Sequence, residues 1–74
     1  MTKDQVLIQE QRGNISHLML NRPEKRNALN DDLVAALDAF FANVPEQTRA
    51  IVISGTGGHF SSGLDLSQHV ARQP

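Results

Sequence analysis

The amino-acid sequence predicts an α/β fold in which two strands, a helix and a third strand lead into a glycine-rich loop. Two short apolar runs, 6–11 and 15–20, are separated by a turn-forming Gly-Asn pair, which is typical of a β-hairpin. Apolar residues then recur at three- and four-residue steps over 31–43, as they do in an amphipathic helix. A run of β-branched residues at 50–54 precedes four closely spaced glycines: Gly55, Gly57, Gly58 and Gly63.

The first two strands are expected at Val6–Gln11 and Ile15–Leu20. Arg12-Gly13-Asn14 lies between them, and Gly and Asn tolerate the positive φ that a tight hairpin turn needs. Apolar and polar residues do not alternate cleanly in the second segment, so we expect that strand to be largely buried.

The helix is expected from Asp31 to Asn43, with Asn30 or Asp31 as its N-cap. Negative charge at Asp31 and Asp32 suits the positive end of the helix dipole. Pro45 stops the helix because proline cannot continue it. The predicted apolar stripe consists of Leu33, Leu37, Phe40, Phe41 and Val44.

The third strand, Ala50–Ser54, has the composition of a buried strand, and a strand–helix–strand crossover predicts a parallel, right-handed unit. The glycine loop after it could hold unpaired backbone N–H groups for an anion or an oxyanion. The alternative is a plain turn into a helix near Asp65, which composition alone favours. The loop is no dinucleotide fingerprint, because Phe60 stands where the third glycine is needed, and no phosphate loop or nucleophile elbow is present.

Composition narrows the function classes. The 74 residues carry a net charge of -1 and no cysteine, so we expect neither a nucleic-acid partner nor a disulfide framework. There is no apolar run long enough to span a bilayer and no signal-peptide pattern, so we expect no membrane association and a cytoplasmic protein.

Two blocks of sequence carry a family resemblance. One is Gly58-His59-Phe60-Ser61-Ser62-Gly63-Leu64-Asp65-Leu66, and the other is Leu20-Asn21-Arg22-Pro23-Glu24-Lys25-Arg26-Asn27-Ala28-Leu29. In this order, with a helix and a strand between them, they resemble the crotonase (enoyl-CoA hydratase/isomerase) superfamily over roughly Val6 to Leu66. The resemblance implies a partial crotonase-like spiral of ββα units, incomplete in this chain. Since crotonase-like proteins are several times longer, residues 1–74 are expected to be the N-terminal portion of a single domain; the alternative is a complete small protein.

The resemblance also implies roles for individual residues. The backbone N–H of Leu64 would be one of two donors to the thioester oxygen of an acyl-coenzyme A (acyl-CoA). Many members have Ala or Met at this position, but the role belongs to the backbone. The residues expected to contact the substrate or its CoA are Lys25, Arg26, Ala28, Ser62, Gly63, Leu64, Asp65 and Leu66.

Simpler interpretations of these residues stay open. Lys25 and Arg26 have the composition of an ordinary solvated loop. Asp65 lies four residues before His69, a spacing that suits a surface ion pair or two metal ligands. Alternatively, Asp65 caps the helix that follows it. Two ligands do not make a metal site, so no metal is expected. His17 and His59 are assigned no role.

The resemblance implies hydration of a 2-enoyl-CoA, or double-bond isomerisation, with CoA as part of the substrate and no other cofactor. It also implies a homo-oligomer, trimeric or hexameric. The acid/base carboxylates and the second oxyanion donor are expected after residue 74, so this stretch alone should be inactive. Those missing residues also decide between hydration and dehalogenation, decarboxylation or thioester hydrolysis. The alternative, from another class, is a non-catalytic crotonase-fold binding or assembly module.

Overall fold

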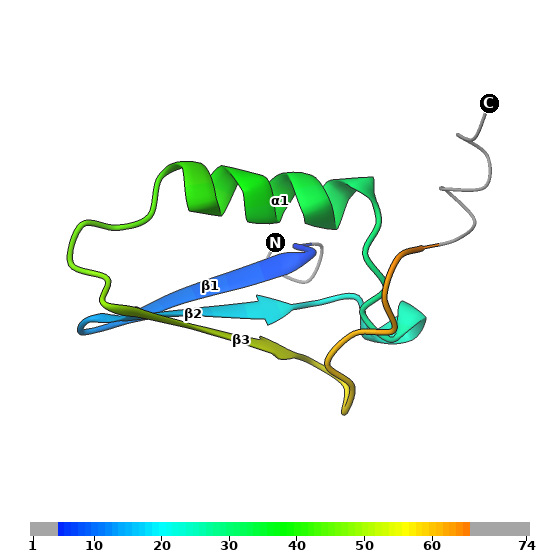
Figure 1. Ribbon diagram of the computed structural model, residues 1–74. Helices are drawn as coiled ribbons and strands as arrows, with labels where there is room; N and C mark the ends of the chain where they lie inside the picture. Colours follow the sequence, from blue (N-terminus) through cyan, green and yellow to red (C-terminus); the bar gives the residue numbers. More distant parts are fainter. Residues whose placement is uncertain (1–4, 66–74) are drawn as a thin grey trace.

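The computed structural model describes residues 5–65, which form a three-stranded sheet covered on one face by a helix (Figure 1). The elements follow the expected α/β order, and their ends lie within one residue of the expected ones. No helix in this part of the chain is both long enough and apolar enough to cross a membrane. The elements are β1 (Leu7–Arg12), β2 (Ile15–Leu20), a 3-10 turn η2 (Pro23–Lys25), α1 (Asp31–Ala42) and β3 (Ala50–Gly55).

The sheet has the strand order β1-β2-β3. β1 and β2 are antiparallel and are joined at a tight turn in which Gly13 has a φ of +59°. β2 and β3 are parallel, as the crossover predicts, and Leu20 pairs with Gly55. Because parallel strands end at the same edge of a sheet, the loops that follow β2 and β3 start side by side.

β2 is buried on one face only. Ser16, Leu18 and Leu20 are at most 2% exposed, whereas the residues between them are partly exposed. The expectation of a largely buried strand therefore holds for one face. The alternation of apolar and polar residues in β2 is interrupted by Ser16, a polar residue on the face that the helix covers. Its hydroxyl lies 2.6 Å from Gln11 Oε1 and 2.7 Å from Thr48 Oγ1, which satisfies the buried oxygen.

Within the part of the chain that the structure describes, β3 is an edge strand, and the predicted burial of this strand is not found there. Val52 is 47% exposed and Ile53 is 39% exposed. Within residues 5–65 the strand pairs with β2 alone, and α1 covers only one face of the sheet (Figure 1). Its β-branched composition therefore indicates a strand without indicating how deeply the strand is buried.

α1 begins at the predicted N-cap: Asn30 Oδ1 accepts a hydrogen bond of 2.9 Å from Leu33 N. The predicted apolar stripe was too wide, because Phe41 is 50% exposed and Val44 lies beyond the helix end. The Phe41 ring meets Phe40 edge to face, with ring centroids 5.3 Å apart. The buried core consists of Leu7, Leu18, Leu20, Leu33 and Phe40.

Candidate functional site

The candidate site lies where the loops after β2 and β3 meet. Thr56 continues the pairing of these strands, because its N–H donates to Leu20 O at 3.0 Å. Its hydroxyl is 2.9 Å from Asn21 Oδ1 in the other loop. Parallel pairing of β2 and β3 therefore brings together the two sequence blocks on which the family resemblance rests.

Asn27 holds the two loops together. Its side chain is fully buried, and its backbone has a φ of +57°, a conformation that Asn tolerates better than most residues. Asn27 Oδ1 accepts from Arg22 N at 2.7 Å, and Nδ2 donates to the carbonyl oxygens of Thr56 and His59, each at 2.8 Å. Sequence reasoning missed this role, although an Asn in a loop without glycine is a signal for left-handed backbone.

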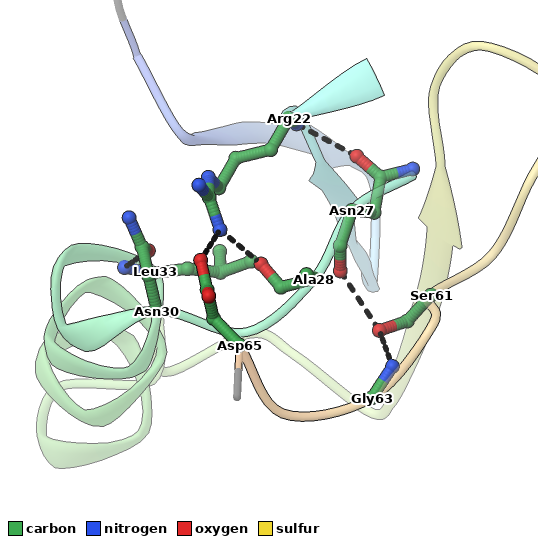
Figure 2. Close-up of polar contacts among 8 residues, drawn as sticks. All are labelled: Arg22, Asn27, Ala28, Asn30, Leu33, Ser61, Gly63 and Asp65. Atoms are coloured by element: carbon green, nitrogen blue, oxygen red, sulfur yellow. Dashed lines mark hydrogen bonds and ion pairs between the residues drawn. The ribbon is translucent and has the colours of Figure 1, made fainter. Parts of the chain in front are cut away.

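Ser61 continues the connection toward the glycine loop. Its hydroxyl donates to Asn27 O at 2.8 Å and accepts from Gly63 N at 3.1 Å (Figure 2). A neighbouring backbone bond joins Ser62 N to Arg26 O at 3.0 Å. The sequence around Ser61 has no nucleophile elbow, and in the structure the Ser61 hydroxyl fixes the backbone.

Leu29 and Leu64 form a parallel β-bridge, called here the Leu29–Leu64 bridge. Leu29 N donates to Gly63 O at 2.7 Å, and Asp65 N donates to Leu29 O at 2.9 Å. A trans peptide directs its C=O and N–H to opposite sides, and no peptide in the described chain is cis. Because Gly63 O points to Leu29, the Leu64 N–H of the same peptide points away from it. Within residues 5–65 this N–H has no hydrogen-bond acceptor.

An apolar pocket of about 370 Å³ adjoins this peptide. It is bounded by the helix, by the ends of β2 and β3 and by the glycine loop. Its lining contains no charged side chain. The lining residues are Leu20, Leu29, Leu37, Ile53, Phe60, Ser61 and Gly63.

A second polar contact crosses the site. Arg22 Nη1 donates to Ala28 O at 2.6 Å and forms an ion pair with Asp65 Oδ2 at 3.4 Å (Figure 2). The Arg22 and Asp65 side chains are only 11% and 17% exposed. Sequence reasoning did not single out Arg22. His69, the partner considered for Asp65 from the sequence, lies outside the described residues, as does the expected helix after Asp65.

The expected CoA-contacting residues lie on both sides of the bridge. Lys25 ends η2, Arg26 follows it with a φ of +50°, and both side chains are exposed. Ala28 is buried, and its carbonyl is occupied by Arg22. Leu64 is 53% exposed, and Ser62 is exposed as well. The contacts expected of these residues with a ligand stay predictions, and Leu66 lies outside the described part of the chain.

Comparisons with known proteins identify the family. The profile described as enoyl-CoA hydratase/isomerase matches residues 10–74. The mitochondrial Delta(3,5)-Delta(2,4)-dienoyl-CoA isomerase of Mus musculus is 37% identical over 65 residues, which are 85% of this chain and 20% of the relative. A candidate enoyl-CoA hydratase from Rhodopseudomonas palustris is 53% identical with a TM-score of 0.79, over 84% of this chain and 24% of that one.

A Thermobifida fusca candidate enoyl-CoA hydratase, solved in complex with acetoacetyl-CoA, is 31% identical with a TM-score of 0.81. The alignment covers 95% of this chain and 28% of that one. The chain thus spans about a fifth to just over a quarter of these three relatives. The profile match covers both loops of the site as well as the helix and strand between them, and the chain belongs to the enoyl-CoA hydratase/isomerase family.

Proposed function

We propose that this chain is the N-terminal part of an acyl-CoA-processing enzyme, a 2-enoyl-CoA hydratase or a double-bond isomerase. In this proposal the backbone N–H of Leu64 donates a hydrogen bond to the thioester oxygen of the substrate. One observation carries the proposal: the bond between Gly63 O and Leu29 N directs the Leu64 N–H away from the bridge, without an acceptor in residues 5–65.

The chemistry explains why a fixed N–H is useful. Addition of water to a conjugated thioester, or removal of a proton beside its carbonyl, places negative charge on the thioester oxygen. A backbone donor aimed at that oxygen stabilises the charge without reorganising, and loss of one such donor typically costs about 3 to 4 kcal/mol. The apolar pocket beside Gly63 brings no competing charge to this interaction.

The CoA moiety would lie across the two loops, with Lys25–Ala28 on one side and residues 62–66 on the other. Exposed cations at Lys25 and Arg26 suit phosphate groups. The substrate's own CoA supplies all that this proposal requires, so no further cofactor is invoked.

The proposal leaves two roles to residues outside this chain, namely the second oxyanion donor and the groups that transfer protons. The apolar pocket is lined by carbon-rich side chains, one hydroxyl and one glycine, and none of them is a general acid or base of suitable pKa. The 74-residue chain by itself is therefore expected to have no hydratase or isomerase activity.

A crystal structure of the intact protein with acetoacetyl-CoA would test the proposal. We expect the thioester oxygen about 2.7–3.1 Å from Leu64 N, the distance of an oxyanion donor, and the CoA against Lys25–Ala28. Free CoA is the matched control and should occupy the same loops without reaching Leu64. A ligand bound elsewhere, or no affinity for CoA thioesters, would contradict the proposal. Correct binding without turnover of any 2-enoyl-CoA would instead favour the non-catalytic module.

A further inference from the structure

Arg22 contacts both strands of the Leu29–Leu64 bridge with a single nitrogen atom. Nη1 is 2.6 Å from the carbonyl oxygen of Ala28, the residue before Leu29. It is also 3.4 Å from Oδ2 of Asp65, the residue after Leu64. Figure 2 shows both contacts starting from the same guanidinium nitrogen, so one charged group contacts both strands of the bridge.

Burial separates this ion pair from an ordinary surface pair. The Arg22 and Asp65 side chains are 11% and 17% exposed, whereas those of the Arg12–Glu10 pair are 73% and 42% exposed. Exposed pairs are screened by water and salt and hold their side chains only loosely. A pair that is shielded from water has a better-defined geometry, because each charge depends on the other and on hydrogen bonds for its stabilisation.

The orientation of the Gly63–Leu64 peptide depends on contacts with other residues. Gly63 has a φ of +95°, in a region that glycine enters without steric cost. The intrinsic preference of Gly63 therefore does little to select one orientation of the Gly63–Leu64 peptide. The orientation is set by the bonds of Gly63 to Leu29 and to the Ser61 hydroxyl, and by the anchoring of Asp65.

We infer that Arg22 and Asp65 are positioning residues that hold the Leu64 N–H in its direction. This inference rests on the proposed function, because it assigns the pair an effect on the oxyanion donor. Arg22 acts from a distance: its guanidinium contacts Ala28 in one strand of the bridge and Asp65 in the other, and the Gly63–Leu64 peptide belongs to the strand that Asp65 continues. The pair need not touch the substrate.

The ionisation of bound acetoacetyl-CoA reports on the Leu64 N–H donor, and a change in the stability of the fold alone does not alter it. The C2 proton of this ligand is acidic because the resulting enolate is conjugated, and the enolate absorbs ultraviolet light more strongly than the keto form. A donor aimed at the thioester oxygen stabilises the enolate and so lowers the pKa of the bound ligand. The ratio of enolate to keto form, measured against pH, thus reports how well the N–H is aimed.

The test compares Arg22→Gln with Arg22→Lys and Arg12→Gln in the intact protein. Gln ends short of the Nη1 position and carries no charge, whereas Lys keeps the charge and most of the length. We expect Arg22→Gln to lower the enolate-to-keto ratio about tenfold, a fraction of the roughly 100-fold or larger loss caused by removing a donor. Arg22→Lys should restore most of this loss, and Arg12→Gln, which removes the exposed pair, should leave the ratio unchanged.

Asp65→Asn is the second variant, because it keeps the side-chain size and leaves the bond from Arg22 to Ala28 possible. It should also lower the ratio, by less than Arg22→Gln, and it carries the test if Arg22→Gln does not fold. Circular dichroism and the affinity for a saturated acyl-CoA, whose C2 protons are too weakly acidic to give a measurable enolate, identify variants with an intact fold.

Folded variants of Arg22 and Asp65 that keep the wild-type ratio would overturn the inference and leave the proposed function standing. A wild-type protein that binds acetoacetyl-CoA without stabilising its enolate would instead contradict the proposed oxyanion donor itself. The two failures are thus separated by the wild-type measurement.

Discussion

The backbone conformation of Gly63 sets the direction of the proposed oxyanion donor, the Leu64 N–H. The Gly63 φ of +95° belongs to the left-handed side of the φ range, the Gly63 carbonyl bonds to Leu29 N, and the Gly63 N–H bonds to the Ser61 hydroxyl. The peptide that follows carries the Leu64 N–H. A side chain at Gly63 would therefore alter the direction of the donor without removing it.

We predict that Gly63→Val weakens ligand binding through backbone strain. A Cβ at this position meets no heavy atom within 4 Å, so the cost comes from the positive φ, about 1–3 kcal/mol for a strained residue. Gly13→Val is the matched control, because Gly13 also has a positive φ and open space around it but lies in the β1–β2 turn. Urea unfolding should show a similar loss for both variants, and only Gly63→Val should lose affinity for acetoacetyl-CoA. Equal affinities in the two variants would disprove this role of Gly63.

Residues that act through local chemistry were predictable, and residues that act through distant partners were not. The N-cap at Asn30 follows from its position before a helix. Asn27 and Arg22 are different, because their partners lie up to 32 and 43 residues away. The sequence of the Asn21–Asn27 loop does not specify those partners. It therefore does not distinguish a loop whose side chains are buried against distant segments from a loop whose side chains are solvated.

At the scale of elements, the sequence predicts which segments form strands and helices better than which faces they bury. Hydrophobic periodicity placed all four elements to within a residue. It did not predict which residues are buried in two strands. In β2, Ser16 occupies a core position, and in β3 the β-branched residues Val52 and Ile53 are exposed. Burial depends on which layer covers each face, and that is a property of the assembled sheet.

The site is likewise a product of element arrangement. Parallel pairing of β2 and β3 places the ends of both strands at one edge, and Leu20 and Gly55 are paired there. The loops from these strands then share Asn27 and the Leu29–Leu64 bridge. The general position of the glycine loop was predictable from the crossover, whereas the direction of the Leu64 N–H required the bridge to be seen.

At the scale of the whole molecule, the described residues have a small core and a large apolar surface. Five hydrophobic residues form the buried core cluster, and eight large hydrophobic residues are exposed. The matched segment makes up about a fifth to just over a quarter of the length of three relatives. The expected trimer or hexamer, and the expected position of this segment at the start of a longer domain, stay predictions.

We predict that residues 1–74 expressed alone are poorly folded or associate. Exposed apolar side chains on an outer strand, including Val52 at 47% and Ile53 at 39% exposure, favour association. Sedimentation and thermal melting by circular dichroism check this. Val52→Thr, which keeps the β-branched shape but is more polar, should reduce the association. A sharp, cooperative melt of a monomer would count against the prediction.

The central claim is that Leu64 contributes its backbone N–H rather than its side chain. The most direct measurement is kcat/KM of the intact protein on a 2-enoyl-CoA, for hydration or isomerisation, with Leu64→Ala and Leu64→Pro compared. Leu64→Ala keeps the donor and should retain substantial activity. Leu64→Pro removes the N–H and should lower kcat/KM about 100- to 1000-fold, the loss expected for one oxyanion donor. Circular dichroism and CoA affinity establish that both variants are folded, and a folded Leu64→Pro variant with near-normal kcat/KM would contradict the account.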